Sequence, residues 1–302
     1  MSRFYEVLRQ ASRSLNDPKD VNGTEDPNYS AVLDEASAPQ SVEEAIPSAK
    51  EFAADSFDPS LVPEAAAQNN GIGVPIEVVL DRKAKLVSNS PEANVVEHYR
   101  LLRTKIMQQR AEQSFRSLLV TSPDPSEGKT ITVLNLAMVL AMLPSLKILV
   151  VDGDLRKGQL SSCLGISNSP GLGNLLEGKN TVEEVVFKSS EIPFYFMGRG
   201  NSKLPAPELL HAAHWSNQVK KLSERFDLVL VDSPPVRLVT DAQLLASGCD
   251  AVLLVARAFL SSRDALEKTC SDLQHSRILG IVLNGSASPG NYSRYSSYAE
   301  ER

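Results

Sequence analysis

The sequence has few cysteines and histidines, the residues from which disulfides and zinc sites are built. Three cysteines and four histidines occur in 302 residues, and Cys163, Cys249 and Cys270 stand at unrelated spacings. An odd number of irregularly spaced cysteines argues against a disulfide framework and a zinc site, and fits reduced thiols in the cytosol. We assign the cysteines no chemistry.

Long apolar runs are also missing. The chain has no run of about 18 apolar residues, which a transmembrane helix needs. The N-terminal residues also lack the apolar stretch of a secretory signal. We expect a cytoplasmic protein whose contact with a membrane is made through a partner.

The charge of the chain is unevenly distributed. Residues 1–80 hold 14 acidic and 5 basic side chains, although the whole chain has a net charge of only −6. This stretch lacks a sustained hydrophobic period, so it cannot bury enough apolar surface to offset the entropy of ordering. We expect residues 16–85 to be a disordered acidic linker. The acidic balance, without a basic stripe, argues against a nucleic acid partner.

Residues 1–15 carry apolar side chains at helical spacing, namely Phe4, Leu8, Ala11 and Leu15. This spacing favours a short docking helix. Isolated helices of this length are marginal in water, so a segment without a docking partner is an equal alternative.

From residue 86 to residue 284, short apolar runs alternate with helical patterns. This alternation indicates an α/β fold with a mostly parallel central sheet flanked by helices. The helix candidates are 130–143, 207–224 and 263–275, and the strand candidates are 117–121, 147–152, 193–197, 227–232, 251–256 and 278–284. Ligands of such sheets bind at the carboxyl edge of the strands.

A candidate phosphate-binding loop follows the first of these strands. Residues 121–131 read Thr-Ser-Pro-Asp-Pro-Ser-Glu-Gly-Lys-Thr-Ile, which would present backbone N–H groups to an anion at a helix N-terminus. Pro123 and Ser126 stand where glycine is common. An incidental Gly-Lys-Thr at a helix start is the alternative. We assign nucleotide binding to Ser126, Glu127, Gly128, Lys129, Thr130 and Ile131.

Carboxylates follow two further strands. One strand ends in Asp152-Gly-Asp154-Leu-Arg156, and another ends in Asp232-Ser-Pro-Pro. Either motif alone could be a helix cap or a turn. Behind a phosphate loop, however, carboxylates at strand ends are the expected partners of Mg²⁺.

Together these motifs resemble a known family. Gly-Lys-Thr, then Asp-x-Asp-x-Arg, then Asp-x-Pro-Pro are similar to the Walker A, A′ and B motifs of the bacterial tyrosine kinases. The second element discriminates, because ordinary P-loop ATPases lack it in that place. Residues 205–210, Pro-Ala-Pro-Glu-Leu-Leu, also resemble a family stretch. The resemblance covers about residues 90–302 and implies a P-loop NTPase fold of the MinD/ParA type.

A helical pattern before the first strand carries a further family feature. Glu97, Arg100 and Arg103 recur every three residues, so that their charges track along one helix face. In the family this helix packs between the subunits of a homo-oligomeric ring. A solvated helix face is the alternative.

Tyrosines are concentrated in residues 285–302, which we expect to be a flexible tail. Three of the seven tyrosines, Tyr292, Tyr295 and Tyr298, lie in the last eleven residues. Aromatic side chains in such a tail have no core to fill. The family's tail is phosphorylated in trans, so the resemblance implies three phosphoacceptors. A sticky tail whose tyrosines are incidental is the alternative.

The resemblance implies a protein-tyrosine autokinase that uses ATP and Mg²⁺. Lys129 would bind the β- and γ-phosphates, Asp152 would accept the proton of the tyrosine hydroxyl, and Asp154 and Asp232 complete the implied catalytic set. Thr130, Asp154 and Asp232 would hold Mg²⁺. Three further assignments are less specific. Arg156 would contact phosphate or steady Asp154, and Asn284 would contact the adenine or form a turn. Asp241 would lie near the metal.

The resemblance also implies a biological role, which is control of exopolysaccharide or capsule polymerisation and export. The implied partners are a membrane polysaccharide co-polymerase that recruits and activates the kinase at the inner face of the plasma membrane, and a protein-tyrosine phosphatase. Two other functions stay open: a positioning ATPase of the MinD/ParA type, and a non-catalytic assembly subunit whose altered loop binds nucleotide weakly.

Overall fold

The computed structural model describes residues 72–78, 80, 86, 93–143 and 145–286. Within these residues a single eight-stranded sheet has the order β1-β4-β5-β3-β6-β2-β7-β8, and every neighbouring pair is parallel except β4 and β5. The strands are β1 (Val74–Pro75), β2 (Ser117–Thr121), β3 (Ile148–Asp152), β4 (Phe187–Lys188), β5 (Tyr195–Met197), β6 (Leu228–Asp232), β7 (Ala251–Arg257) and β8 (Ile278–Asn284). The predicted α/β class with a mostly parallel sheet is confirmed.

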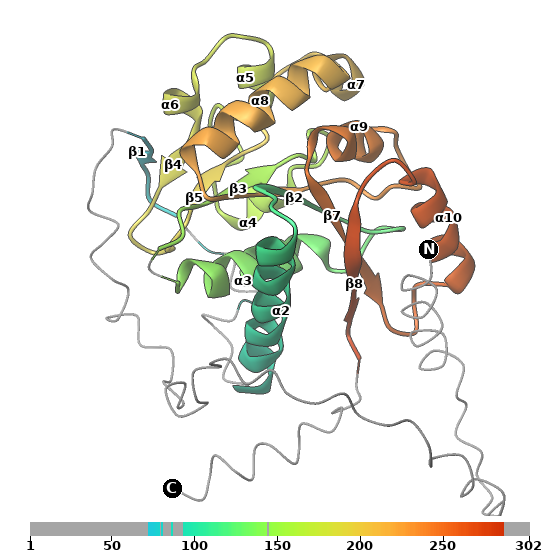
Figure 1. Cartoon of the computed structure of the whole chain (residues 1–302). Coiled ribbons are helices and arrows are strands. Elements are labelled where there is room, and N and C mark those ends of the chain that lie inside the picture. Colours follow the sequence, from blue (N-terminus) through green and yellow to red (C-terminus); the bar gives the residue numbers. More distant parts are fainter. Residues whose placement is uncertain (1–71, 79, 81–85, 87–92, 144, 287–302) are drawn as a thin grey trace, which may run out of the picture. The chain divides into compact units, whose positions relative to one another are not determined.

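Helices cover both faces of this sheet (Figure 1). They are α2 (Ala93–Glu112), α3 (Lys129–Ala141), α4 (Gln159–Cys163), α5 (Leu172–Leu176), α6 (Val182–Val185), α7 (Ala206–Leu209), α8 (Ala212–Arg225), α9 (Asp241–Gly248) and α10 (Arg263–Asp272). No helix in this described part is both long enough and apolar enough to cross a membrane.

The central strands separate two hydrophobic cores because successive side chains of a strand point to opposite faces. In β2, Leu118 and Val120 pack in the core under α2, α3 and α4, whereas Leu119 packs in the core on the opposite face. All five residues of β2, β3 and β6 are buried. These continuous apolar runs are typical of parallel strands covered on both faces.

The N-terminal boundary of the folded part differs from the prediction. Val74–Pro75 lies inside the range 16–85 that we expected to be disordered, but it is strand β1. The N–H groups of Val74 and Ile76 donate to the carbonyls of Val186 and Lys188 at 2.8 and 3.0 Å. A two-residue strand has no periodic signature, so the sequence alone did not reveal it. The possible docking helix 1–15, most of the linker and residues 287–302 lie outside the described residues.

The helix expected over 207–224 is two helices. Chain direction changes at His211, the residue before α8, whose φ of −44° and ψ of 127° are not helical. The short helix α7 therefore ends at Leu209, and α8 starts at Ala212. The sequence predicted one helix here because apolar residues continue across this break.

The single tryptophan joins two helices on one face of the sheet. Trp215 of α8 is fully buried, and its indole Nε1 donates to the Leu245 carbonyl of α9 at 2.9 Å. This contact satisfies both the indole N–H and a carbonyl in the last turn of α9, where helices leave carbonyls unpaired.

Replacing Trp215 by phenylalanine should therefore destabilise the protein. The change removes packing volume and leaves the Leu245 carbonyl without its donor, so we expect the free energy of unfolding to fall by about 1–3 kcal/mol. Urea denaturation followed by far-ultraviolet circular dichroism measures this, since the only tryptophan fluorophore is lost. His214→Ala, at the exposed neighbouring position, is the control. Equal unfolding midpoints for the two variants would contradict this role of the indole.

Candidate functional site

The phosphate loop is the turn between β2 and α3. Gly128 adopts φ = 94° directly before α3, and no side chain caps the helix N-terminus. The N–H groups of the first helical turn therefore have no intrahelical partner and can bind an anion. A Cβ at Gly128 would lie 2.0 Å from Nδ2 of Asn284. Another residue here would be strained by the positive φ and would require the Asn284 side chain to shift.

The contact between Thr130 and Asp232 joins the loop to the end of β6. Thr130 Oγ1 donates to Asp232 Oδ2 at 2.7 Å. Asp232 is fully buried, and its Oδ1 has no hydrogen-bond partner among the described residues. Burial raises the pKa of Asp232 to about 7, while the charge of Lys129 opposes the shift and that of Asp152 adds to it. This arrangement favours a nearby cation.

Asp152 lies beside Asp232, because the two residues are register partners on neighbouring strands. Its Oδ2 accepts hydrogen bonds from the N–H and the hydroxyl of Ser161 at 2.7 and 2.6 Å. Burial raises the pKa of Asp152 to about 6 against the effect of these hydrogen bonds. Ser161 thus positions the proposed base. Sequence reasoning missed Ser161, since it belongs to no recognised motif.

Asp154 is held at the same edge by a tight turn. Its Oδ1 accepts the Lys157 N–H at 3.0 Å, and the side chain is almost fully buried. The intervening Gly153 donates its N–H to the Asp232 carbonyl at 2.8 Å. A Cβ at Gly153 would lie 2.5 Å from that carbonyl oxygen. The glycine of the Asp-Gly-Asp motif thus lets the turn close against β6.

Arg156 pairs with a different carboxylate from the one proposed. Its Nε and Nη2 donate to the two carboxylate oxygens of Asp241 at 2.7 and 3.1 Å. Asp241 is buried, whereas the Arg156 side chain is half exposed. The structure therefore joins Arg156 to Asp241 instead of Asp154, and it gives Asp241 an ion pair. Contact of Arg156 with phosphate stays a prediction.

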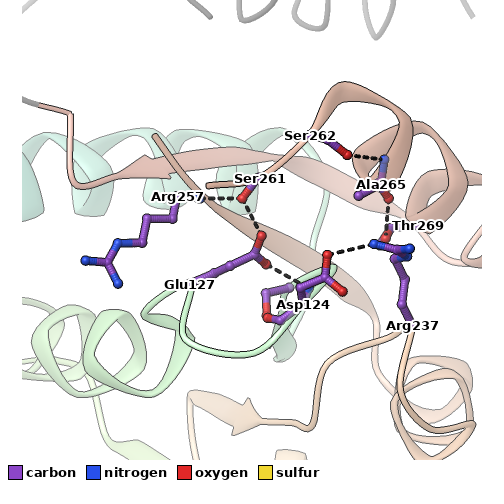
Figure 2. A network of polar contacts seen from close by, with 9 residues as sticks. Asp124, Glu127, Arg237, Arg257, Ser261, Ser262, Ala265 and Thr269 are labelled. Atoms are coloured by element: carbon purple, nitrogen blue, oxygen red, sulfur yellow. Dashed lines mark hydrogen bonds and ion pairs between the residues drawn. The ribbon is translucent and has the colours of Figure 1, made fainter. Parts of the chain in front are cut away.

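Glu127, which the sequence assigned to nucleotide binding, turns its side chain to contacts inside the protein (Figure 2). Its carboxylate is buried and accepts hydrogen bonds from the Ser261 hydroxyl and from the Asp124 N–H, the latter at 3.0 Å. Burial raises the pKa of Glu127. Asp124 in turn pairs with Arg237 at 2.7 Å. The Glu127 side chain is thus engaged inside the protein, which leaves its backbone as the part that can bind a nucleotide.

Asn284 contacts the loop from the end of β8. Its Nδ2 donates to the Glu127 carbonyl at 3.0 Å. This contact is with the phosphate loop itself, and it does not test the predicted adenine contact of Asn284. Ile131, also assigned to the site, lies in the first turn of α3 beside Thr130.

The charges of α2 are partly used within the chain. Arg100 pairs with Glu97 at 2.6 Å on an exposed helix face. Arg103 Nη1 instead donates to the Val139 carbonyl at 2.8 Å and so ties α2 to α3. Of the three residues expected at a ring interface, Arg103 therefore also has a contact inside the subunit.

The residues at the loop fit Mg²⁺ with a nucleotide. No group of three or more His, Cys, Asp and Glu side chains in the described part could hold a metal by itself. Mg²⁺, however, usually takes one or two carboxylates and completes its shell with water and phosphate oxygens. Asp232, with its unpartnered Oδ1, and the adjacent Thr130 hydroxyl supply such a partial donor set.

Comparison with known proteins identifies the family. The AAA domain family matches residues 126–275. The chain is 30% identical to the tyrosine-protein kinase YwqD of Bacillus subtilis (strain 168) over 216 residues, which cover 70% of this chain and 89% of YwqD. The chain belongs to the bacterial tyrosine-protein kinase family. This membership confirms the family that the three motifs predicted.

Two further relatives of this tyrosine kinase family define what the chain covers. The kinase domain of the Escherichia coli tyrosine kinase Etk is 30% identical, with a TM-score of 0.61, over 67% of this chain and 80% of that one. The tyrosine-protein kinase ptk of Acinetobacter johnsonii is 31% identical over 66% of this chain. The match spans only 27% of ptk. The P-loop NTPase fold of the family is thus present here.

Ser126 generates a prediction about strain. It is a non-glycine residue with φ = 64° in the phosphate loop, where the family pattern often has glycine. A left-handed backbone costs residues with a Cβ roughly 1–2 kcal/mol. Glycine avoids this cost but lowers stability by about 0.5–1 kcal/mol, because it has more conformational freedom in the unfolded state. We expect Ser126→Gly to raise the free energy of unfolding by about 0.5–1 kcal/mol in urea denaturation. Ser126→Ala keeps the Cβ and should give no gain. Equal stability of the two variants would show that the backbone is not strained.

Proposed function

We propose that the protein is an ATP-dependent tyrosine autokinase that phosphorylates Tyr292, Tyr295 and Tyr298 of a neighbouring copy. The observation that carries the proposal is the contact between Thr130 and Asp232, with Asp152 as the register partner of Asp232. A phosphate loop, a buried metal-binding carboxylate and a second carboxylate for the acceptor hydroxyl are the parts that phosphoryl transfer requires. Membership of the tyrosine kinase family supports the same activity.

The residues act by positioning and charge. Lys129 would hold the β- and γ-phosphates, and Thr130, Asp154 and Asp232 would hold Mg²⁺, which when bound would neutralise phosphate charge. Asp152, oriented by Ser161, accepts the proton of the tyrosine hydroxyl. The tyrosine oxygen bonds to the γ-phosphorus as the bond from that phosphorus to ADP breaks. Such electrostatic stabilisation supplies most of the catalysis in phosphoryl transfer.

The acceptor tail supplies the regulation. Each phosphate adds nearly two negative charges at neutral pH. Successive phosphates on the tail should therefore repel the acidic carboxylates of a neighbouring site and release the tail. Cycling between the two states, with removal of phosphate by a protein-tyrosine phosphatase, would control polymerisation and export of an exopolysaccharide or capsule.

Assembly completes the proposal. Glu97, Arg100 and Arg103 of α2 contribute to a ring of subunits, and a membrane polysaccharide co-polymerase recruits this ring to the inner face of the plasma membrane and activates it. The exposed ion pair between Glu97 and Arg100 supports a contact role for this helix face.

Incubation of the full chain with Mg²⁺ and γ-labelled ATP tests the activity. We expect label on Tyr292, Tyr295 or Tyr298, mapped by mass spectrometry and increased by the cytoplasmic segment of a co-polymerase. Lys129→Met removes the charge at the phosphates and should reduce labelling by more than about 100-fold. ATP hydrolysis without tyrosine label would instead favour a positioning ATPase, and nucleotide binding without either activity would favour an assembly subunit.

Asp232→Asn tests the metal assignment. The amide can keep the contact with Thr130 but cannot supply a negative charge, so Mg²⁺ should no longer strengthen ADP binding in calorimetric titrations. The fold should persist, because a neutral group costs less to bury than a carboxylate. Asp264→Asn, an exposed carboxylate on α10, is the matched control. Retention of the full Mg²⁺ effect in Asp232→Asn would overturn the assignment.

A further inference from the structure

Three hydrogen bonds fasten the phosphate loop to the last residue of β7, to the turn that follows β7 and to the end of β8, and a fourth joins that turn to β7. Arg257 Nη1 donates to the Ser126 carbonyl at 3.0 Å, and Asn284 Nδ2 donates to the Glu127 carbonyl at 3.0 Å. The Ser261 hydroxyl donates to the Glu127 carboxylate and accepts the Arg257 N–H at 2.7 Å. Figure 2 shows Ser261 between Arg257 and Glu127.

These contacts hold two successive carbonyls of the loop. In a trans peptide unit the carbonyl and the following N–H point in opposite directions. The bond from Arg257 to the Ser126 carbonyl therefore sets the direction of the Glu127 N–H. The bond from Asn284 sets that of the Gly128 N–H in the same way. Neither N–H donates a hydrogen bond within the described residues, so both are available to an anion.

The backbone conformation of Ser126 gives this fastening a physical reason. Ser126 has φ = 64°, a conformation that a residue with a Cβ avoids unless its surroundings enforce it. Its carbonyl is the group that Arg257 holds. Ser126 is exposed, so its conformation is not imposed by burial of its side chain.

We propose that Arg257 is a positioning residue of the nucleotide site, which aligns the loop N–H groups for the phosphates of ADP or ATP by holding the Ser126 carbonyl. Ser261 supports this role, because one hydroxyl fixes both the Arg257 backbone and the Glu127 side chain. The proposal rests on the proposed nucleotide site, although it does not depend on tyrosine being the acceptor.

Calorimetric titration of the full chain with Mg²⁺–ADP tests the proposal by comparing the effect of Arg257→Gln in the wild-type chain and in a Ser126→Gly background. Arg257→Gln should weaken binding about fivefold, which is the net value of one typical intramolecular hydrogen bond. Glycine adopts φ = 64° unaided. In a Ser126→Gly background the same change at Arg257 should therefore cost about twofold or less.

Arg263→Gln removes an equal charge from the start of α10, where Arg263 pairs with Glu267, and should leave ADP binding unchanged. An equal loss from Arg257→Gln in both backgrounds would show that the guanidinium acts on the nucleotide by its charge, and would overturn the positioning role. No loss in either background would overturn it as well.

Amide hydrogen exchange without nucleotide separates this proposal from the proposed function. Arg257→Gln should speed exchange in the peptide that contains residues 122–130, and Ser126→Gly should reverse the effect. If the wild-type chain bound no ADP, the nucleotide site would fail, and the exchange rates alone would decide whether Arg257 holds the loop. Unchanged exchange in Arg257→Gln would overturn the proposal.

Discussion

The burial of carboxylates at the carboxyl edge of the central strands is the constraint on which this site depends. Asp152 and Asp232 are register partners and fully buried, and Asp154 lies two residues beyond. Burying several negative charges together is unfavourable unless cations or donors compensate. The chain supplies Lys129, the Thr130 hydroxyl and the Ser161 contacts. The remaining imbalance favours binding of a metal ion with its nucleotide.

The sequence was sufficient for the parts of the fold with a strong local signature. Strands β2, β3 and β6 are continuous apolar runs that end in Thr121, Asp152 and Asp232, so their positions could be predicted closely. The positions of strands β1 and β4 could not be predicted. Each has only two residues, which show no hydrophobic period, and they form strands because they pair with each other. The break at His211 escaped prediction for a related reason, since backbone direction there is set by packing and not by composition.

For the site, motifs predicted the residues that face the ligand but not those that support them. Thr130, Asp152 and Asp232 follow strands at recognisable positions. Ser161, in the short helix that follows Asp152, and Ser261, in a turn far along the chain from Glu127, hold two of the buried carboxylates. A serine in a turn has many possible roles, so only the folded structure reveals that its hydroxyl meets a carboxylate. Arg156 shows the reverse, a motif residue whose observed partner is Asp241.

The residues at the two departures from the usual loop pattern are both held by contacts from outside the loop. Pro123 cannot donate a backbone hydrogen bond, but its carbonyl accepts the Arg237 N–H at 3.2 Å, while Arg237 also pairs with Asp124. Ser126 adopts a backbone suited to glycine, and Arg257 holds its carbonyl. The loop is therefore shaped by Arg237, which follows β6, and by Arg257, at the end of β7, where the usual pattern has glycine. Because these arginines lie on segments beside the site, any partner that moves them would also change the phosphate loop.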